Sequence, residues 1–167
     1  MKNIILIKLI FIAFFFSQAN AFEYTERTAI GSGYSYLSLK HGISEKIAIE
    51  GRISSVSGIT AAGGRLNFIN SYFLPVKEIE AFCGIELNAC FFNNEIMRGY
   101  GFTALLFEGM EYFINESFSL NVDIGPCLTV LFDSEDPSIN VAGIDLVINL
   151  GFNYYFKKKG KGNNVKQ

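Results

Sequence analysis

The stretch VAGIDLVINLGFNYYF, residues 141–156, decides the fold of this chain. From Ala142 to Phe156 every even-numbered residue is apolar, whereas the odd-numbered positions are mostly small or polar, such as Gly143 and Asn149. Successive side chains of a β-strand point to opposite faces, so this alternation predicts one long strand with an apolar face. A helix would scatter the same residues around its circumference.

The same alternation recurs in residues 118–132 and 79–91, and turn-forming residues separate the alternating segments. No segment has the periodicity of a helix, and no internal repeat or linker is visible. The pattern predicts eight strands near residues 24–33, 35–42, 46–56, 60–73, 79–92, 100–114, 117–132 and 139–156.

The number of strands limits the architecture. A membrane strand needs about 9–11 residues, so residues 22–156 have room for eight strands and their turns but not for twelve. Lipid tolerates no unpaired backbone, and bacterial barrels have even strand numbers from eight upward. We therefore predict the fold class as all-β, a single antiparallel up-and-down transmembrane β-barrel of eight strands, in one domain over residues 22–156.

The two ends of the chain predict where the protein is located. Residues 1–21 combine Lys2 and Lys8 with a short apolar run and the cleavage site Ala19-Asn20-Ala21, the pattern of a secretory signal peptide. We expect cleavage after Ala21 and a final location in the bacterial outer membrane. Residues 157–167 hold five lysines and form a predicted basic, disordered tail.

Alternation alone does not determine which face of the barrel is outside. The polar faces are rich in small residues, as the narrow interior of an eight-stranded barrel requires. Aromatic residues such as Phe118, Phe132 and Tyr154 lie at strand ends, as in the aromatic girdles of outer-membrane barrels. Both features favour apolar faces that point toward lipid. The alternative is a secreted, soluble lipid-binding barrel with its apolar face inside.

An outward apolar face places nine charged residues inside the barrel. Because a buried charge is costly unless it is paired, we predict that three cations tie six carboxylates into an interior charge network. Its members are Lys40, Glu50, Arg52, Arg65, Glu80, Glu86, Glu111, Asp123 and Asp145. The favoured interpretation is a filled, polar interior; the alternative is a narrow outer-membrane pore.

Other conspicuous residues predict no enzymatic chemistry. His41 is the only histidine, and Cys83, Cys90 and Cys127 lack the spacing of a metal site. The glycine clusters open no helix and have no phosphate-binding lysine, and no nucleic-acid patch is visible. Glu108 falls on the apolar face of its strand, and a β-bulge that resets the register there is the favoured explanation. Pro126, inside a strand pattern, also indicates a bulge or irregularity. We expect that the protein is not an enzyme and that it binds no cofactor and no metal ion.

The end of the barrel domain carries a predicted assembly signal. Asn149, Gly151, Tyr154 and Phe156 have a polar-x-Gly-x-x-aromatic-x-aromatic spacing, which resembles the signal that ends outer-membrane barrel proteins. It implies the barrel assembly machinery as a partner. Here eleven residues follow Phe156, whereas such barrels commonly end at the aromatic residue.

Several short segments, taken in order, resemble a family of small bacterial outer-membrane β-barrel proteins of uncharacterised activity. They are LSLK (37–40), IAIEG (47–51), GMEYFINE (109–116), LNVDIGP (120–126) and GFNYYF (151–156). The resemblance implies an eight-stranded barrel without established catalytic residues. We expect a monomeric, integral outer-membrane protein with a structural or surface-interaction role. Its expected partners are outer-membrane lipid and an extracellular ligand of unknown nature.

Overall fold

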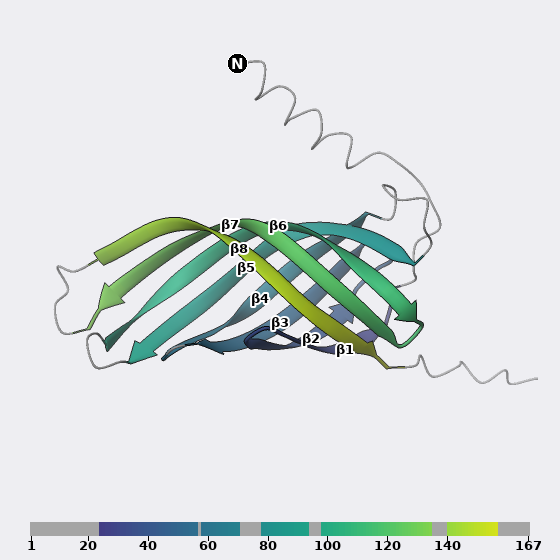
Figure 1. The fold of residues 1–167 in the computed structure, drawn as a ribbon, viewed down its shortest axis with the longest axis horizontal. Helices are drawn as coiled ribbons and strands as arrows, with labels where there is room; N and C mark the ends of the chain where they lie inside the picture. The colour runs from purple at the N-terminus through teal and green to yellow at the C-terminus, as the bar shows by residue number, and fades with distance from the viewer. Residues whose placement is uncertain (1–23, 57, 71–77, 94–97, 135–139, 157–167) are drawn as a thin grey trace, which may run out of the picture.

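The computed structural model describes residues 24–56, 58–70, 78–93, 98–134 and 140–156. Eight antiparallel strands form one closed barrel, in which sequence neighbours pair and β8 returns to β1 (Figure 1). The strands are β1 (Thr28–Gly33), β2 (Tyr36–Gly42), β3 (Ile47–Val56), β4 (Ile59–Asn70), β5 (Ile79–Asn93), β6 (Arg98–Asn115), β7 (Phe118–Asp133) and β8 (Asn140–Tyr155). The predicted all-β, up-and-down barrel of eight strands is confirmed. The described part of the chain contains no helix long and apolar enough to cross a membrane.

The first strand is shorter than the alternation predicted. It begins at Thr28 rather than at residue 24, because Glu26 adopts a left-handed conformation with φ 62° and starts a turn. Within this turn the Arg27 amide donates to the Tyr24 carbonyl at 2.9 Å. The predicted signal peptide (1–21) and the predicted basic tail (157–167) lie outside the described residues.

The barrel wall is uneven in height. β1 and β2 have six and seven residues, whereas β5 to β8 have 15 to 18. The seam between β1 and β8 therefore consists of five residue pairs, from Ala29↔Tyr155 to Gly33↔Gly151. The tilted strands of Figure 1 show this difference, with the short strands at one end of the barrel. The described ends of the chain lie at that same end, where the Phe156 amide donates to the Thr28 carbonyl.

The two faces of the wall have opposite polarity. Large apolar side chains such as Ile144, Leu146 and Leu150 are exposed on the outside. Charged and amide side chains are buried inside, among them Arg65, Asn67 and Asp123, each at most 4% exposed. The prediction that the polar parity points inward is thus confirmed for the described strands.

One predicted irregularity was wrong. The β6–β7 ladder keeps one register from Leu105↔Cys127 to Glu108↔Ile124, and its register shifts only between Phe113 and Asn115. Pro126 pairs with Leu146 in an unbroken β7–β8 ladder. On its other side the β6–β7 ladder has no residue pair at Gly125 or Pro126, so the irregularity predicted at Pro126 is present there as a local gap without a change of register. A bulge at Glu108 would displace every pair beyond it on both neighbouring strands, and a single charge does not outweigh that loss of hydrogen bonds. Glu108 therefore points outward from a regular strand and is exposed.

Candidate functional site

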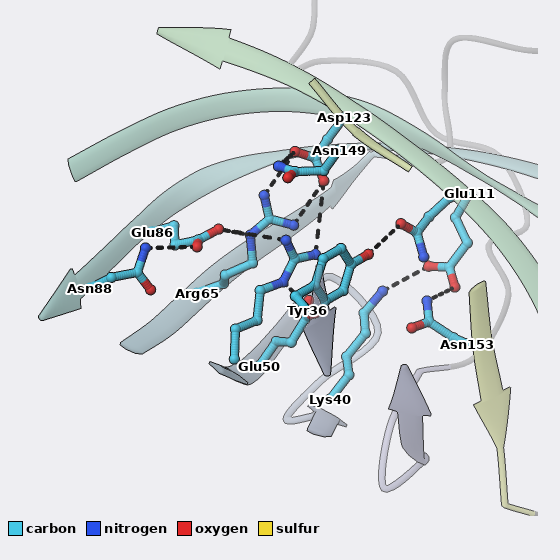
Figure 2. Close-up of polar contacts among 12 residues, drawn as sticks. Tyr36, Lys40, Glu50, Arg65, Glu86, Asn88, Glu111, Asp123, Asn149 and Asn153 are labelled. Atoms are coloured by element: carbon cyan, nitrogen blue, oxygen red, sulfur yellow. Dashed lines mark hydrogen bonds and ion pairs between the residues drawn. The ribbon is translucent and has the colours of Figure 1, made fainter. Parts of the chain in front are cut away.

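The interior charge network is a layer of arginines and carboxylates that point toward one another across the lumen (Figure 2). Arg65 on β4 reaches across the lumen to Asp123 on β7, and its two terminal nitrogens each lie 2.9 Å from a carboxylate oxygen. Its Nε lies 2.6 Å from Oε2 of Glu86, an ion pair that does not align as a hydrogen bond. A two-pronged arginine–carboxylate pair of this kind is strong and directional.

Arg52 forms the second cross-link of the layer. Its Nε donates to Glu50 at 2.8 Å, and its terminal nitrogens lie 3.7 Å from Glu86 and 3.9 Å from Asp123. Its guanidinium stacks 4.0 Å above the ring of Tyr36. Because Arg52 and Arg65 share Glu86 and Asp123, four strands are tied together across the lumen.

Glu111 is a second hub, nearer the end where the chain termini lie. It is 0% exposed and pairs with Lys40 at 2.7 Å. Four more donors point at its two oxygens: Tyr24 at 2.9 Å, Ser119 at 2.5 Å, Asn153 at 2.7 Å and Tyr155 at 2.8 Å. A carboxylate with five donors is stabilised in its charged form, which offsets the cost of its burial.

The aromatic rings of this hub close the lumen on the same side. Tyr24, Phe113 and Tyr155 pack edge to face or tilted, with centroids 5.6 to 6.1 Å apart. Tyr24 lies outside the strands; burial, followed by the charge of Glu111, raises the pKa of its phenol well above its ordinary value. Tyr24 therefore remains a neutral hydrogen-bond donor in the barrel end.

The structure brings eight of the nine predicted network residues together. Seven of them form the ion pairs above, and Glu80 is 2% exposed opposite Glu111 in the β5–β6 ladder. Asp145 is the exception. It has the inward parity, opposite Cys127, but it is exposed and forms no ion pair with any described residue. Parity predicts the direction of a side chain but not its height in the barrel, and Asp145 lies near the open end.

The four residues of the predicted assembly signal have visible local contacts. Asn149 donates to Asp123 at 2.7 Å and so belongs to the charge layer. Gly151 makes room for the ring of Tyr36, which a Cβ at that position would overlap. Tyr154 and Phe156 are exposed on the outer wall with ring centroids 5.8 Å apart. Their role in assembly stays a prediction.

Several residues of the site were missed by the sequence analysis. Ser119, Asn153 and Tyr155 have inward parity and could have been found from it, had neutral donors been considered together with charges. Tyr24 could not be found from strand parity, because it lies before β1 and enters the lumen through a turn. Tyr36 belongs to the alternation of β2, but its stacking on Arg52 depends on tertiary contacts.

The remaining conspicuous residues lie elsewhere. Cys90 and Cys127 are buried in the lumen, Cys83 is on the outer wall, and all three are free thiols. His41 is exposed and its Nδ1 lies 2.9 Å from the hydroxyl of Thr28, its partner in the β1–β2 ladder. Among the residues that the structure describes, no group of three or more His, Cys, Asp or Glu side chains could hold a metal ion.

The arrangement cross-links the barrel and occupies part of its lumen. Among the described residues, the buried charged side chains are three cations, Lys40, Arg52 and Arg65, and five carboxyl groups, so carboxyl groups outnumber cations inside the barrel. No family model matches this chain, and no curated protein is significantly similar to it. The resemblance to small outer-membrane barrels thus remains a hypothesis based on the short segments quoted above.

Proposed function

We propose that this protein is an integral bacterial outer-membrane β-barrel with a structural or surface-interaction role and a side-chain-filled interior. The main observation in support is that the barrel wall has apolar side chains outside and charged side chains inside. Leu146, Ile148 and Leu150 are more than 60% exposed, whereas the buried positions of the interior include Arg65 and Glu111. An exposed apolar band of this kind is unfavourable in water and favourable in the hydrocarbon core of a membrane.

Aromatic pairs at the two ends of the apolar band support the same proposal. Tyr100 and Phe132 stack at 5.6 Å on one end of the wall, and Phe118 and Phe152 stack at 5.7 Å on the other. Such girdles occur where a barrel meets the two membrane interfaces. A soluble lipid carrier would need an apolar interior, and the charge layer occupies that space.

The side chains that cross and close the lumen favour a scaffold over a transporter. Arg52 and Arg65 span the lumen, and the cluster of Tyr24, Phe113 and Tyr155 closes one end. Eight-stranded barrels enclose just enough room for their own side chains. In this proposal the protein is a monomer, its signal peptide is cleaved after Ala21, and the barrel assembly machinery and surrounding lipid are its general partners.

The test is gel mobility of the outer-membrane fraction, compared before and after boiling. A closed barrel that resists detergent runs faster unboiled, and the band shifts when heat opens it. We expect the band that shifts on boiling in the outer-membrane fraction. We also expect the mature chain to begin at Phe22, directly after the cleavage site. Recovery of the protein from the soluble periplasm, without detergent, would contradict the membrane proposal.

A surface-interaction role needs its own test. Deleting residues 95–96, or separately 135–138, shortens the connections β5–β6 and β7–β8 and leaves two residues for the turn between the paired strands. Binding of whole cells to immobilised host-matrix proteins should fall in at least one deletion that still shows the heat-dependent mobility shift. Unchanged adhesion in both deletions would leave the structural role alone.

A further inference from the structure

The outer wall of the barrel has a groove of about 560 Å³. It reaches from Phe68 on β4 to Leu146 on β8, and its apolar side chains include Ile85, Leu106 and Ile124. These residues belong to the apolar band that the proposed function places against hydrocarbon. The groove is therefore open from the membrane side and not from the lumen.

The backbone helps to shape this groove. Gly84 and Gly125 line it without a side chain. Within the described strands, the β6–β7 ladder has no residue pair at Gly125 or Pro126, although the register is the same on both sides of them. Pro126 has no N–H to donate to the neighbouring strand, and a Cβ on Gly125 would overlap the carbonyl of Leu106. The hollow is thus built into β6 and β7 and is not only a gap between side chains.

Glu108 gives the groove its single charge among the described lining residues. Its carboxylate is exposed and forms no ion pair with any described residue. Tyr100 and Tyr112 are exposed on the same outer face of β6, one on each side of Glu108 along the strand. The nearer of them, Tyr112, is about 13 Å along the strand at 3.4 Å per residue. Glu108 therefore lies inside the apolar band and not at its edge.

The lining specifies the chemistry of a ligand. A lone carboxylate in hydrocarbon is costly and marks a candidate functional site whose partner is a cation. An ammonium group can donate charge-assisted hydrogen bonds to it, and an apolar chain suits the rest of the groove. Membrane lipids hold their ammonium groups at the interface, outside the hydrocarbon core. A free amphiphile, which can move to the depth of Glu108, fits the site better than a lipid headgroup does.

We propose that this groove binds a free amphiphilic amine. Its apolar chain packs against Phe68, Ile85 and Leu106, and its ammonium group donates to the carboxylate of Glu108. No covalent bond forms or breaks. The site rests on the proposed membrane location, because only hydrocarbon leaves the carboxylate without water to solvate it. It adds a small-molecule ligand to the scaffold role.

The test is an NMR titration of the folded barrel in detergent micelles with dodecylamine, the barrel being labelled at its isoleucine and leucine methyl groups. We expect saturable shifts of the methyl signals of Ile85, Leu106 and Ile124. Leu39, exposed on β2 across the closed barrel from β6, should show only the general effect of the amine on the micelle. Dodecanol has the same chain without the charge and should give no saturable shift in the same concentration range.

A pair of variants tests the role of the charge. Glu108→Gln keeps the size of the side chain and removes its charge, so dodecylamine binding should weaken about 10- to 100-fold. Glu45→Gln, in the exposed β2–β3 turn, is the matched control and should leave binding unchanged. The wild-type comparison of dodecylamine with dodecanol does not depend on how these variants fold.

The possible outcomes separate this site from the proposed function. The site is overturned if dodecanol binds as tightly as the amine, if Glu108→Gln binds unchanged, or if Leu39 shifts together with the groove. A barrel that shows the heat-dependent mobility shift in the outer-membrane fraction but no saturable binding removes this site alone. A protein that is soluble without detergent removes the membrane location, and the site with it.

Discussion

At the scale of single residues, the burial of Glu111 is the most demanding feature of this protein. Its carboxylate is fully buried, and Lys40 supplies the only formal positive charge that contacts it among the described side chains. The net stability that a buried ion pair provides is smaller than the stability lost when one partner is removed. The loss is larger because the remaining charge stays buried without compensation.

Replacing Glu111 by glutamine should therefore destabilise the barrel by about 3–5 kcal/mol. The double variant Lys40→Met/Glu111→Gln should recover part of this loss, since no buried charge is then left unpaired. The measurement is the urea midpoint of the heat-dependent mobility shift in detergent. Glu45→Gln, in the exposed β2–β3 turn, is the control. If the double variant is less stable than Glu111→Gln, the ion pair itself provides the stability.

Glu108 poses the opposite problem, because its carboxylate is on the outer wall. It lies beside an apolar groove of about 560 Å³ lined by Phe68, Ile85 and Leu106. In lipid a charge on this face costs stability, less for Glu than the 2–4 kcal/mol of a basic residue. Glu108→Leu should raise the free energy of unfolding in lipid vesicles by about 1–2 kcal/mol. An unchanged or lower value would mean that this face is not in hydrocarbon.

At the scale of the strands, the seam between β1 and β8 is the weak line of the barrel. It has five residue pairs, whereas β7 and β8 share fifteen. Tyr36 reinforces it, because its ring lies over Gly33 and Gly151 and leaves no room for a Cβ at either position. The stacking of Arg52 on the same ring connects the seam to the charge layer.

Gly151→Ala should accordingly displace Tyr36 and cost about 1–3 kcal/mol, the usual range for overpacking. Gly143→Ala is the matched control on the same strand, since a Cβ there meets nothing within 4 Å. We expect the temperature at which the folded band disappears to fall for Gly151→Ala and to stay unchanged for Gly143→Ala. Equal effects of the two substitutions would remove the packing explanation.

At the scale of the whole molecule, the barrel is a short tube divided into three parts. An aromatic cluster with Glu111 closes one end, the arginine–carboxylate layer spans the middle, and a cavity of about 290 Å³ lies in the lumen on the other side of this layer. A continuous water path would have to cross two layers of hydrogen-bonded side chains.

Planar-bilayer recordings of the purified protein should therefore show no steady single-channel conductance. If conductance steps do occur, the comparison with Arg52→Lys decides their origin, because this substitution keeps the charge but loses the planar contact with Tyr36. Steps that change in size with Arg52→Lys would establish the narrow-pore alternative. Steps identical in both proteins would come from a path outside this layer.

The sequence by itself determined the strands, their number and the parity of their side chains. These follow from a period of two, which is a local property that each strand carries alone. The inward placement of Arg52, Arg65 and Asp123 was predictable for this reason. Only the tertiary structure decided which charges meet, that Asp145 stays outside the network, and that Tyr24 enters the lumen. Those outcomes depend on register and height across eight strands, and register is a property of the closed barrel as a whole.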